Sequence, residues 1–309
     1  MLKMTFKALC LSILLGISCL ISARHHVLRL GTKAVKVIKV VLFDIGGVLA
    51  ETSYFRMSKD IGWRYPINYM FKDFKNPNIK TLCFKTLERL FGPQKVHAGE
   101  LMAFRDGLVL PQIMCDWLTD SMTPTEIRHK VTHGISKLAK EGYFSSKNER
   151  EYVLKILLTM FCSPILARNT LPIKAAIKLT DDIAAQCNSQ RKPRFIQAIL
   201  SNYASEPFNL VFNGAQCAPV FKHIDRRYVF TSGSLHDLKP RHSIYSTVIQ
   251  KFINDGIITN ASEIVFIDDQ EENVIAARQC GMTALHLKNG DYKTLRKQLR
   301  ALGILLSKK

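Results

Sequence analysis

Acidic residues are scarce in this chain of 309 residues, which has 25 Asp and Glu against 44 Lys and Arg. The formal net charge of +19 favours anionic company, such as phosphorylated substrates, anionic lipid surfaces or nucleic acid. A solvated basic surface would explain the same charge, so the charge alone names no partner. With 47% hydrophobic residues, the composition excludes a disordered chain and predicts a globular one.

Cysteine patterns of a metal or redox site are also missing. No two cysteines form a CxxC pair, and no group of Cys and His has zinc-site spacing. Two of the eight cysteines fall within the first 23 residues, and the other six are scattered along the chain. An exported protein could form one or two disulfides from these six, but isolated buried thiols explain most of the positions.

Long apolar runs are absent beyond the N-terminus, so no later segment predicts a membrane-spanning helix. The N-terminus has two lysines, then the sixteen uncharged residues Ala8–Ala23, then Arg24. This is the pattern of an export signal, and the run is shorter than the roughly 20 residues of a spanning helix. We therefore predict that residues 1–23 are a signal peptide, cleaved after Ala23 or Ser18, or an uncleaved membrane anchor. The protein is expected to be exported (periplasmic or secreted), or membrane-anchored through this segment.

Strand-like runs at 35–43, 194–201, 227–232, 263–268 and 282–287 are interspersed with helix-like segments near 173–188, 241–254 and 271–280. Such alternation predicts an α/β fold with a Rossmann-like parallel sheet. Strand patterns are scarce at 53–169, where four helical stretches follow one another; one begins at Thr123 and Pro124, with Glu126 behind them. We expect a core of residues 35–52 and 170–309 with an inserted α-helical cap domain at 53–169.

Aromatic and basic side chains interleave at 54–75. Such a mixture can stack on bases and pair with phosphates. The packed inner face of a helical lid, with basic residues outside, explains it more simply. Nucleic acid is therefore disfavoured as a partner, and a small phosphorylated substrate is preferred.

Four polar sites follow the predicted strands, at the sheet edge where open α/β sheets bind their ligands. Taken singly, each has an ordinary explanation as a helix cap, a turn or a loop dipeptide. Together and in this order they are far more specific. The sites are Asp44 in KVVLFDIGGVLA, Ser201 and Asn202 in ILSNY, Lys239 in HDLKPRHSIY, and Asp268 and Asp269 in VFIDDQEENV.

These four sites resemble the motifs of the haloacid dehalogenase-like (HAD) hydrolase superfamily, in the branch whose helical cap follows the first motif. FDIGGVL is similar to motif I, LSN to motif II, LKPRHSIY to motif III and FIDDQEENVIAARQCGM to motif IV. The resemblance covers the predicted core only. It implies a Mg²⁺-dependent phosphatase that hydrolyses a phosphomonoester through an aspartyl-phosphate on Asp44.

The resemblance also implies a role for each matching residue. Asp44 is the expected nucleophile, Lys239 neutralises the anions that meet there, and Ser201 donates a hydrogen bond to a phosphoryl oxygen. The implied Mg²⁺ ligands are the carboxylates of Asp44, Asp269 and, directly or through water, Asp268, with the Gly46 carbonyl. The phosphate would be bound by Gly46, Gly47, Ser201, Asn202 and Lys239, with backbone N–H groups freed by the two glycines.

Gly46 departs from the family pattern, which has a second Asp two residues after the nucleophile. That acid protonates the leaving oxygen and typically contributes about 10²–10⁴-fold in rate, roughly 3–5 kcal/mol of barrier. Anomeric sugar, acyl or aryl phosphates leave easily enough to do without it. A cap residue or water could also supply the proton.

Two alternative functions stay open at this point. The first is a catalytically weak or inactive binding or regulatory protein on the same scaffold. The second is a dehalogenase that needs no metal, against which the retained pair Asp268–Asp269 speaks. The substrate is set by the cap, where Arg64, Arg105, Trp117 and His97 are candidates to face the site, although structural or surface roles explain each of them.

Overall fold

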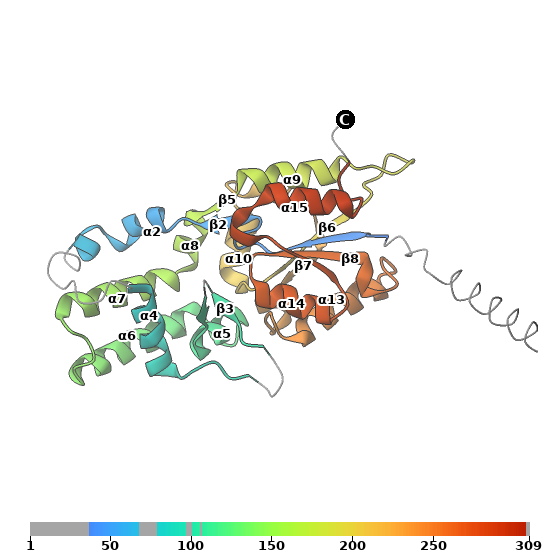
Figure 1. Cartoon of the computed structure of the whole chain (residues 1–309). Coiled ribbons are helices and arrows are strands. Elements are labelled where there is room, and N and C mark those ends of the chain that lie inside the picture. The colour runs from blue at the N-terminus through green and yellow to red at the C-terminus, as the bar shows by residue number, and fades with distance from the viewer. Residues whose placement is uncertain (1–36, 68–78, 97–100, 106, 307–309) are drawn as a thin grey trace, which may run out of the picture. The chain divides into compact units, whose positions relative to one another are not determined.

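A five-stranded parallel sheet forms the centre of the computed structural model, which describes residues 37–67, 79–96, 101–105 and 107–306 (Figure 1). Contacts divide the chain into two units, Met1–Val37 and Ile38–Lys309, and all elements below belong to the second. The strand order is β7-β6-β1-β8-β9, and every neighbouring pair is parallel. The α/β class and the Rossmann-like parallel sheet are confirmed. The strands are β1 (Val40–Phe43), β6 (Ile196–Ser201), β7 (Ile224–Thr231), β8 (Ile264–Asp268) and β9 (Thr283–His286).

Successive side chains of β1 point to opposite faces of the sheet, and both faces are covered, which explains its unbroken apolar run. Val41 and Phe43 join a buried cluster with α9 (Lys174–Ala184), α10 (Ser205–Phe212) and α15 (Tyr292–Ala301). Val40 and Leu42 join another with α13 (His242–Asn254) and α14 (Glu271–Gln279). Figure 1 shows α9 and α15 on one side of the sheet and α13 and α14 on the other. The short elements are α11 (Ala218–Phe221), α12 (Ser232–Leu235), η1 (Ala261–Glu263) and η2 (Lys288–Gly290).

The chain leaves the core through β2 (Ala50–Thr52) and returns through β5 (Thr170–Pro172), which pair antiparallel. Six helices lie between them in the described residues: α2 (Tyr54–Ile61), α4 (Ile79–Phe91), α5 (Gln112–Leu118), α6 (Pro124–Lys140), α7 (Lys147–Met160) and α8 (Ser163–Asn169). A hairpin of β3 (Phe104–Arg105) and β4 (Leu108–Val109) also lies there. α6 starts with the expected capping box of Thr123 and Glu126. The sequence predicted neither strand pair, because two or three residues show no periodicity.

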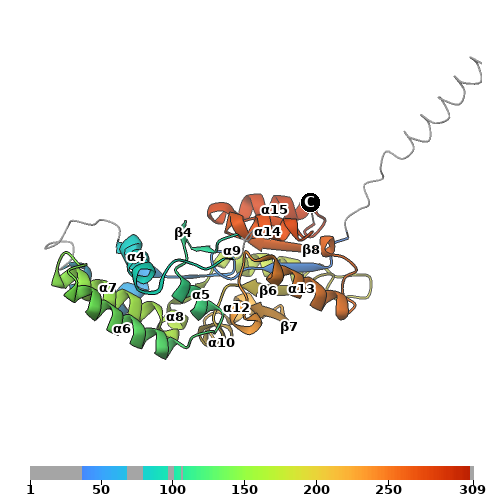
Figure 2. The same ribbon diagram turned by 90° about the horizontal axis from the view of Figure 1, so that it is seen from below.

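The inserted helices have a hydrophobic core of their own. Leu87 of α4, Val131 of α6 and Leu157 of α7 are fully buried in it. Ala204 and Leu238, from the loops at the end of the sheet, belong to the same cluster. The insertion therefore packs onto the sheet edge that carries the predicted site, and Figure 2 shows α5 and α8 nearest to that edge.

Three expectations concern regions away from the sheet. The predicted leader at 1–23 and its membrane association lie outside the described residues and stay predictions; within the described part of the chain, no helix has the length and apolarity needed to cross a bilayer. The idea of a packed lid face at 54–75 is wrong for Phe55 and Trp63, which are 68% and 49% exposed. The six cysteines beyond residue 37 are all free thiols, and burial raises the pKa of Cys83 to about 12.

Candidate active site

A buried ammonium group joins two carboxylates at the carboxyl end of the sheet. Lys239 Nζ donates hydrogen bonds to Asp44 Oδ1 at 2.8 Å, to Asp268 Oδ2 at 2.6 Å and to the Leu200 carbonyl at 3.1 Å. The Lys239 side chain is 1% exposed, and those of Asp44 and Asp268 are 8% and 0% exposed. An ion pair this deep is stable only with both charges present, because either charge alone would be buried without compensation.

Neighbouring groups determine which of these residues are charged. Burial disfavours the charged form of Lys239, but Asp268 and Asp44 outweigh it and raise the Lys239 pKa above its usual value. Burial raises the pKa of Asp44, and Lys239 and the Ser201 hydroxyl partly oppose this by favouring its charged form. The charged form of Lys239 is thus favoured, and its ammonium group lies beside the Asp44 carboxylate.

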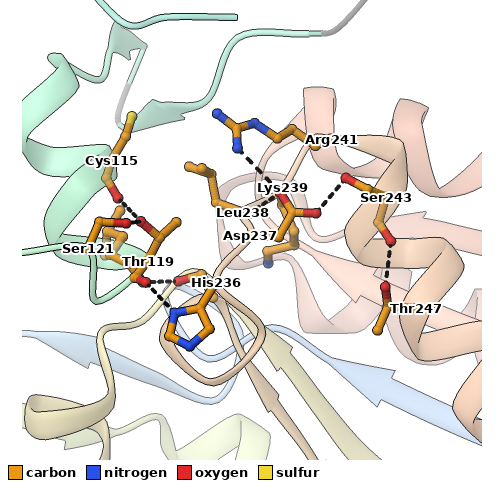
Figure 3. Close-up of polar contacts among 12 residues, drawn as sticks. Cys115, Thr119, Ser121, His236, Asp237, Leu238, Lys239, Arg241, Ser243 and Thr247 are labelled. Carbon is orange, nitrogen blue, oxygen red and sulfur yellow. Dashed lines mark hydrogen bonds and ion pairs between the residues drawn. The ribbon is translucent and has the colours of Figure 1, made fainter. Parts of the chain in front are cut away.

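The loop that carries Lys239 is held from several sides. The Asn202 side chain accepts from the Lys239 N–H at 2.8 Å and donates to the Lys239 carbonyl at 2.9 Å. Figure 3 shows this loop beside α5, where His236 contacts the Thr119 carbonyl at 3.0 Å. Because both polar ends of the Asn202 side chain contact the Lys239 backbone, Asn202 positions Lys239, and its predicted binding of phosphate stays a prediction.

Asp268 is fully engaged by its surroundings. Its Oδ1 accepts from the Gln270 N–H at 2.8 Å, and the Asn273 amide donates to both carboxylate oxygens at 3.1 Å. With Lys239 as a further partner, Asp268 orients the ammonium group and has little free capacity for a metal. The sequence analysis assigned no role to Asn273. Its place early in α14, five residues after Asp268, could have predicted this contact, because helix side chains tilt toward the N-terminus of the helix.

Asp269 has the opposite character. Its Oδ1 is buried and has no hydrogen-bond partner among the described residues. Burial, and then the charges of Asp44 and Asp268, raise the pKa of Asp269 to about 8. A buried carboxylate with a free oxygen and a raised pKa is one that a bound cation would stabilise in its charged form.

The donor set fits a hard divalent ion. One carboxylate oxygen from each of Asp44, Asp268 and Asp269 lies within 4.8 Å of the others. Three carboxylates and one ammonium sum to two negative charges, which a divalent cation balances. The Gly46 carbonyl accepts no hydrogen bond from the described residues and is also available. Oxygen ligands of this kind are those that Mg²⁺ prefers.

The turn after Asp44 needs glycine at only one of its two glycine positions. Gly47 has φ +70°, and a Cβ there would overlap the Asp269 carboxylate. At Gly46 the nearest contact of a Cβ would be Asp44 Oδ2 at 3.7 Å, which is ordinary van der Waals distance. The Gly47 N–H donates to the Ala50 carbonyl at 3.0 Å, so in this structure its role is conformational, and its predicted contact with phosphate stays a prediction.

These residues surround a cavity of about 330 Å³ between the sheet edge and the insertion. The predicted residues that line it are Asp44, Gly46, Gly47, Ser201, Asn202, Lys239 and Asp269, whereas Asp268 lies behind Lys239. Of the cap candidates, Arg105 and Trp117 line the cavity and Arg64 does not. His97 lies outside the described residues.

Comparisons with known proteins give similarities to solved structures alone, since no family model and no curated protein matches the chain. The chain is similar to a HAD family enzyme from Bacteroides thetaiotaomicron, with 18% identity, 84% of this chain and 98% of that chain covered, and a TM-score of 0.46. It is similar to L-2-haloacid dehalogenase from Xanthobacter autotrophicus, with 15% identity, 85% and 83% covered, and a TM-score of 0.46. A HAD family hydrolase from Deinococcus radiodurans, solved with phosphate and sodium, has 15% identity, 88% and 100% covered, and a TM-score of 0.46.

Proposed function

We propose that this protein is a HAD-like hydrolase that acts as a Mg²⁺-dependent phosphatase on a small phosphorylated substrate. The observation that carries the proposal is one buried arrangement. Asp44 shares the Lys239 ammonium group with Asp268, and Asp269 holds an unpartnered carboxylate oxygen beside them. A purely structural ion pair would need neither the open cavity nor the third acid.

In the proposed reaction, Asp44 attacks phosphorus and forms an aspartyl-phosphate, which water then hydrolyses. The attack brings two anions together, and Lys239 lowers the repulsion between them. The Ser201 hydroxyl, 2% exposed at the end of β6, donates to a phosphoryl oxygen. Mg²⁺, held by Asp44, Asp269 and the Gly46 carbonyl, would supply the remaining positive charge.

Protonation of the leaving oxygen is the step for which this site is least equipped. Gly46 provides no acid, and the carboxyl side chains that line the cavity are those of Asp44, Asp269 and Glu51 among the described residues. Asp44 and Asp269 are committed to attack and to the metal. We therefore assign the site to esters with good leaving groups, with Glu51 or water as the source of a proton.

Turnover of p-nitrophenyl phosphate with Mg²⁺ and with EDTA tests the proposal. We expect metal-dependent hydrolysis that Asp44→Asn reduces to background. Asp225→Asn is the matched control, because Asp225 pairs with Arg227 on the surface, away from the cavity. Circular dichroism checks that each variant is folded.

Two other outcomes identify the alternative functions. A folded protein that turns over no member of a phosphate panel would be a binding or regulatory protein. Halide release from a 2-haloacid without metal would indicate a dehalogenase. The unpartnered Asp269 oxygen disfavours the second alternative, since a metal-free reaction has no use for it.

A further inference from the structure

The insertion supplies a largely apolar part of the cavity wall. Phe104 of β3, Leu110, Leu118 at the end of α5 and Leu166 of α8 all line it. Leu110 is 2% exposed, and Leu118 and Leu166 are 6% exposed. A leaving group that fills this space would be flat or hydrophobic, because a polar sugar would leave its hydroxyls without partners there.

One buried donor on this wall has no partner. Trp117 lines the cavity, is 3% exposed, and stacks edge-on against Phe161 with ring centroids 5.2 Å apart. Its indole N–H makes no hydrogen bond within the described part of the chain. This N–H is enclosed by protein atoms, so a bound molecule would meet the indole ring and not its N–H group.

The same wall holds a cation that is free to bind an anion. Arg105 of β3 and Lys239 are the two basic side chains among the described residues that line the cavity. Lys239 is saturated by Asp44 and Asp268, whereas Arg105 forms no ion pair with any described residue. Arg105 opposes the rise that burial causes in the pKa of Tyr203, which also lines the cavity. A guanidinium group in this position matches the fork of a carboxylate or phosphate.

We propose that the substrate's leaving group is aromatic or similarly flat, packs against Trp117 and the apolar wall, and carries a second anionic group that pairs with Arg105. This rests on the proposed phosphatase function and narrows its substrate class to aryl phosphates with a carboxylate or a second phosphate. An aryl oxide leaves readily, which agrees with the missing acid at Gly46. The apolar wall binds the ring, Arg105 binds the second anionic group, and the phosphate to be cleaved lies at Asp44.

Binding of non-hydrolysable phosphonates to the full chain tests this without turnover. The probes are benzylphosphonate, its 4-carboxyl and 4-phosphonomethyl derivatives, and the neutral 4-carboxamide, each with saturating Mg²⁺. The chain has two tryptophans, Trp63 and Trp117. In the Trp63→Phe variant, fluorescence therefore reports Trp117 alone, and calorimetry supplies the affinities.

We expect either dianionic probe to bind roughly 10- to 100-fold more tightly than the carboxamide, as for a charge-assisted hydrogen bond. Binding should change the Trp117 emission. Arg105→Gln should abolish the difference between the anionic probe and the carboxamide. Arg64→Gln, which removes the same charge outside the cavity, should keep it. The two dianionic probes distinguish a carboxylate from a second phosphate.

Equal affinities for the carboxyl and carboxamide probes in the unmodified protein would overturn this inference, and so would unchanged Trp117 emission on binding. Neither result bears on p-nitrophenyl phosphate turnover, which tests the phosphatase function by itself. Conversely, a protein that shows no turnover but still prefers the anionic probes would support the proposed ligand class and refute the proposed phosphatase activity.

Discussion

Replacing Gly46 with Asp restores the carboxyl group that the family pattern has at this position. The backbone tolerates the change, because a Cβ at Gly46 meets only Asp44 Oδ2, at 3.7 Å. The new side chain would stand beside the nucleophile and face the cavity. Gly47 offers no such opportunity, since its positive φ and the Asp269 carboxylate exclude a side chain. We therefore expect the protein to tolerate a side chain at Gly46 and not at the adjacent Gly47.

The expected gain depends on the leaving group. A positioned general acid contributes about 10²–10⁴-fold, roughly 3–5 kcal/mol, when the leaving oxygen needs a proton in the transition state. A propyl oxide needs one and a p-nitrophenolate does not. The rate on propyl phosphate should therefore rise by a factor in that range, and the rate on p-nitrophenyl phosphate should change little.

The added charge has its own cost in the metal-free protein. Two carboxylates about 4–5 Å apart repel by roughly 3–4 kcal/mol at an effective dielectric of about 20. The site already holds the carboxylates of Asp44, Asp268 and Asp269 against one ammonium group. We expect Gly46→Asp to lower the unfolding free energy without metal and to regain most of it when Mg²⁺ binds.

The assay is kcat/KM on propyl phosphate and p-nitrophenyl phosphate for the unmodified protein, Gly46→Asp and Gly46→Asn. The asparagine variant keeps the shape of the side chain and lacks the acid. Equal gains on both esters, or equal gains in both variants, would contradict the leaving-group explanation. A propyl phosphate rate that falls in Glu51→Gln and does not rise in Gly46→Asp would assign the acid to Glu51.

Four further predictions concern the charges of the site and the start of α6. Lys239→Met should lower the unfolding free energy by about 3–5 kcal/mol, because it leaves two buried carboxylates without a cation, and adding Asp268→Asn should restore part of it in urea titrations. Because the pKa of Asp269 is about 8, Mg²⁺ must displace a proton from this group at lower pH. The Mg²⁺ affinity measured by calorimetry should therefore rise roughly tenfold per pH unit up to about pH 8 and then level off. The Asp269→Asn variant should lose this pH dependence. The pKa of Asp269 is higher in the folded protein than in the unfolded chain, so the metal-free protein is destabilised when this group ionises. Its unfolding free energy should therefore be highest below about pH 3.8 and should fall as the pH rises through about 8. An unfolding free energy that does not change over this range would refute the assignment. Thr123→Ala should lower the unfolding free energy by about 1 kcal/mol by removing the α6 capping box, while Thr125→Ala, on the exposed first turn, should not.

The sheet, the parallel direction of its strands and the edge at which the polar residues lie could all be predicted from the sequence. Continuous apolar runs such as Val40–Phe43 are characteristic of strands that are buried on both faces, and each strand that ends in a polar residue delivers it to the same edge. Four of the six helices of the insertion in the described residues, α4 to α7, were predicted from the sequence, and α6 carries its own start signal at Thr123, whereas the short α2 and α8 were not predicted.

The different roles of these polar residues became visible only in the tertiary structure. Asp268 and Asp269 are neighbours in the sequence, yet one is saturated by Lys239 and Asn273 while the other keeps an unpartnered oxygen. The difference arises because adjacent residues at a strand end point in different directions, toward partners far away in the chain. Arg105 and Trp117 were among the candidates to face the site, but no local pattern separated them from Arg64. Their position depends on how the insertion packs against the sheet edge, and that packing brings residues more than 60 positions from Asp44 to the same cavity.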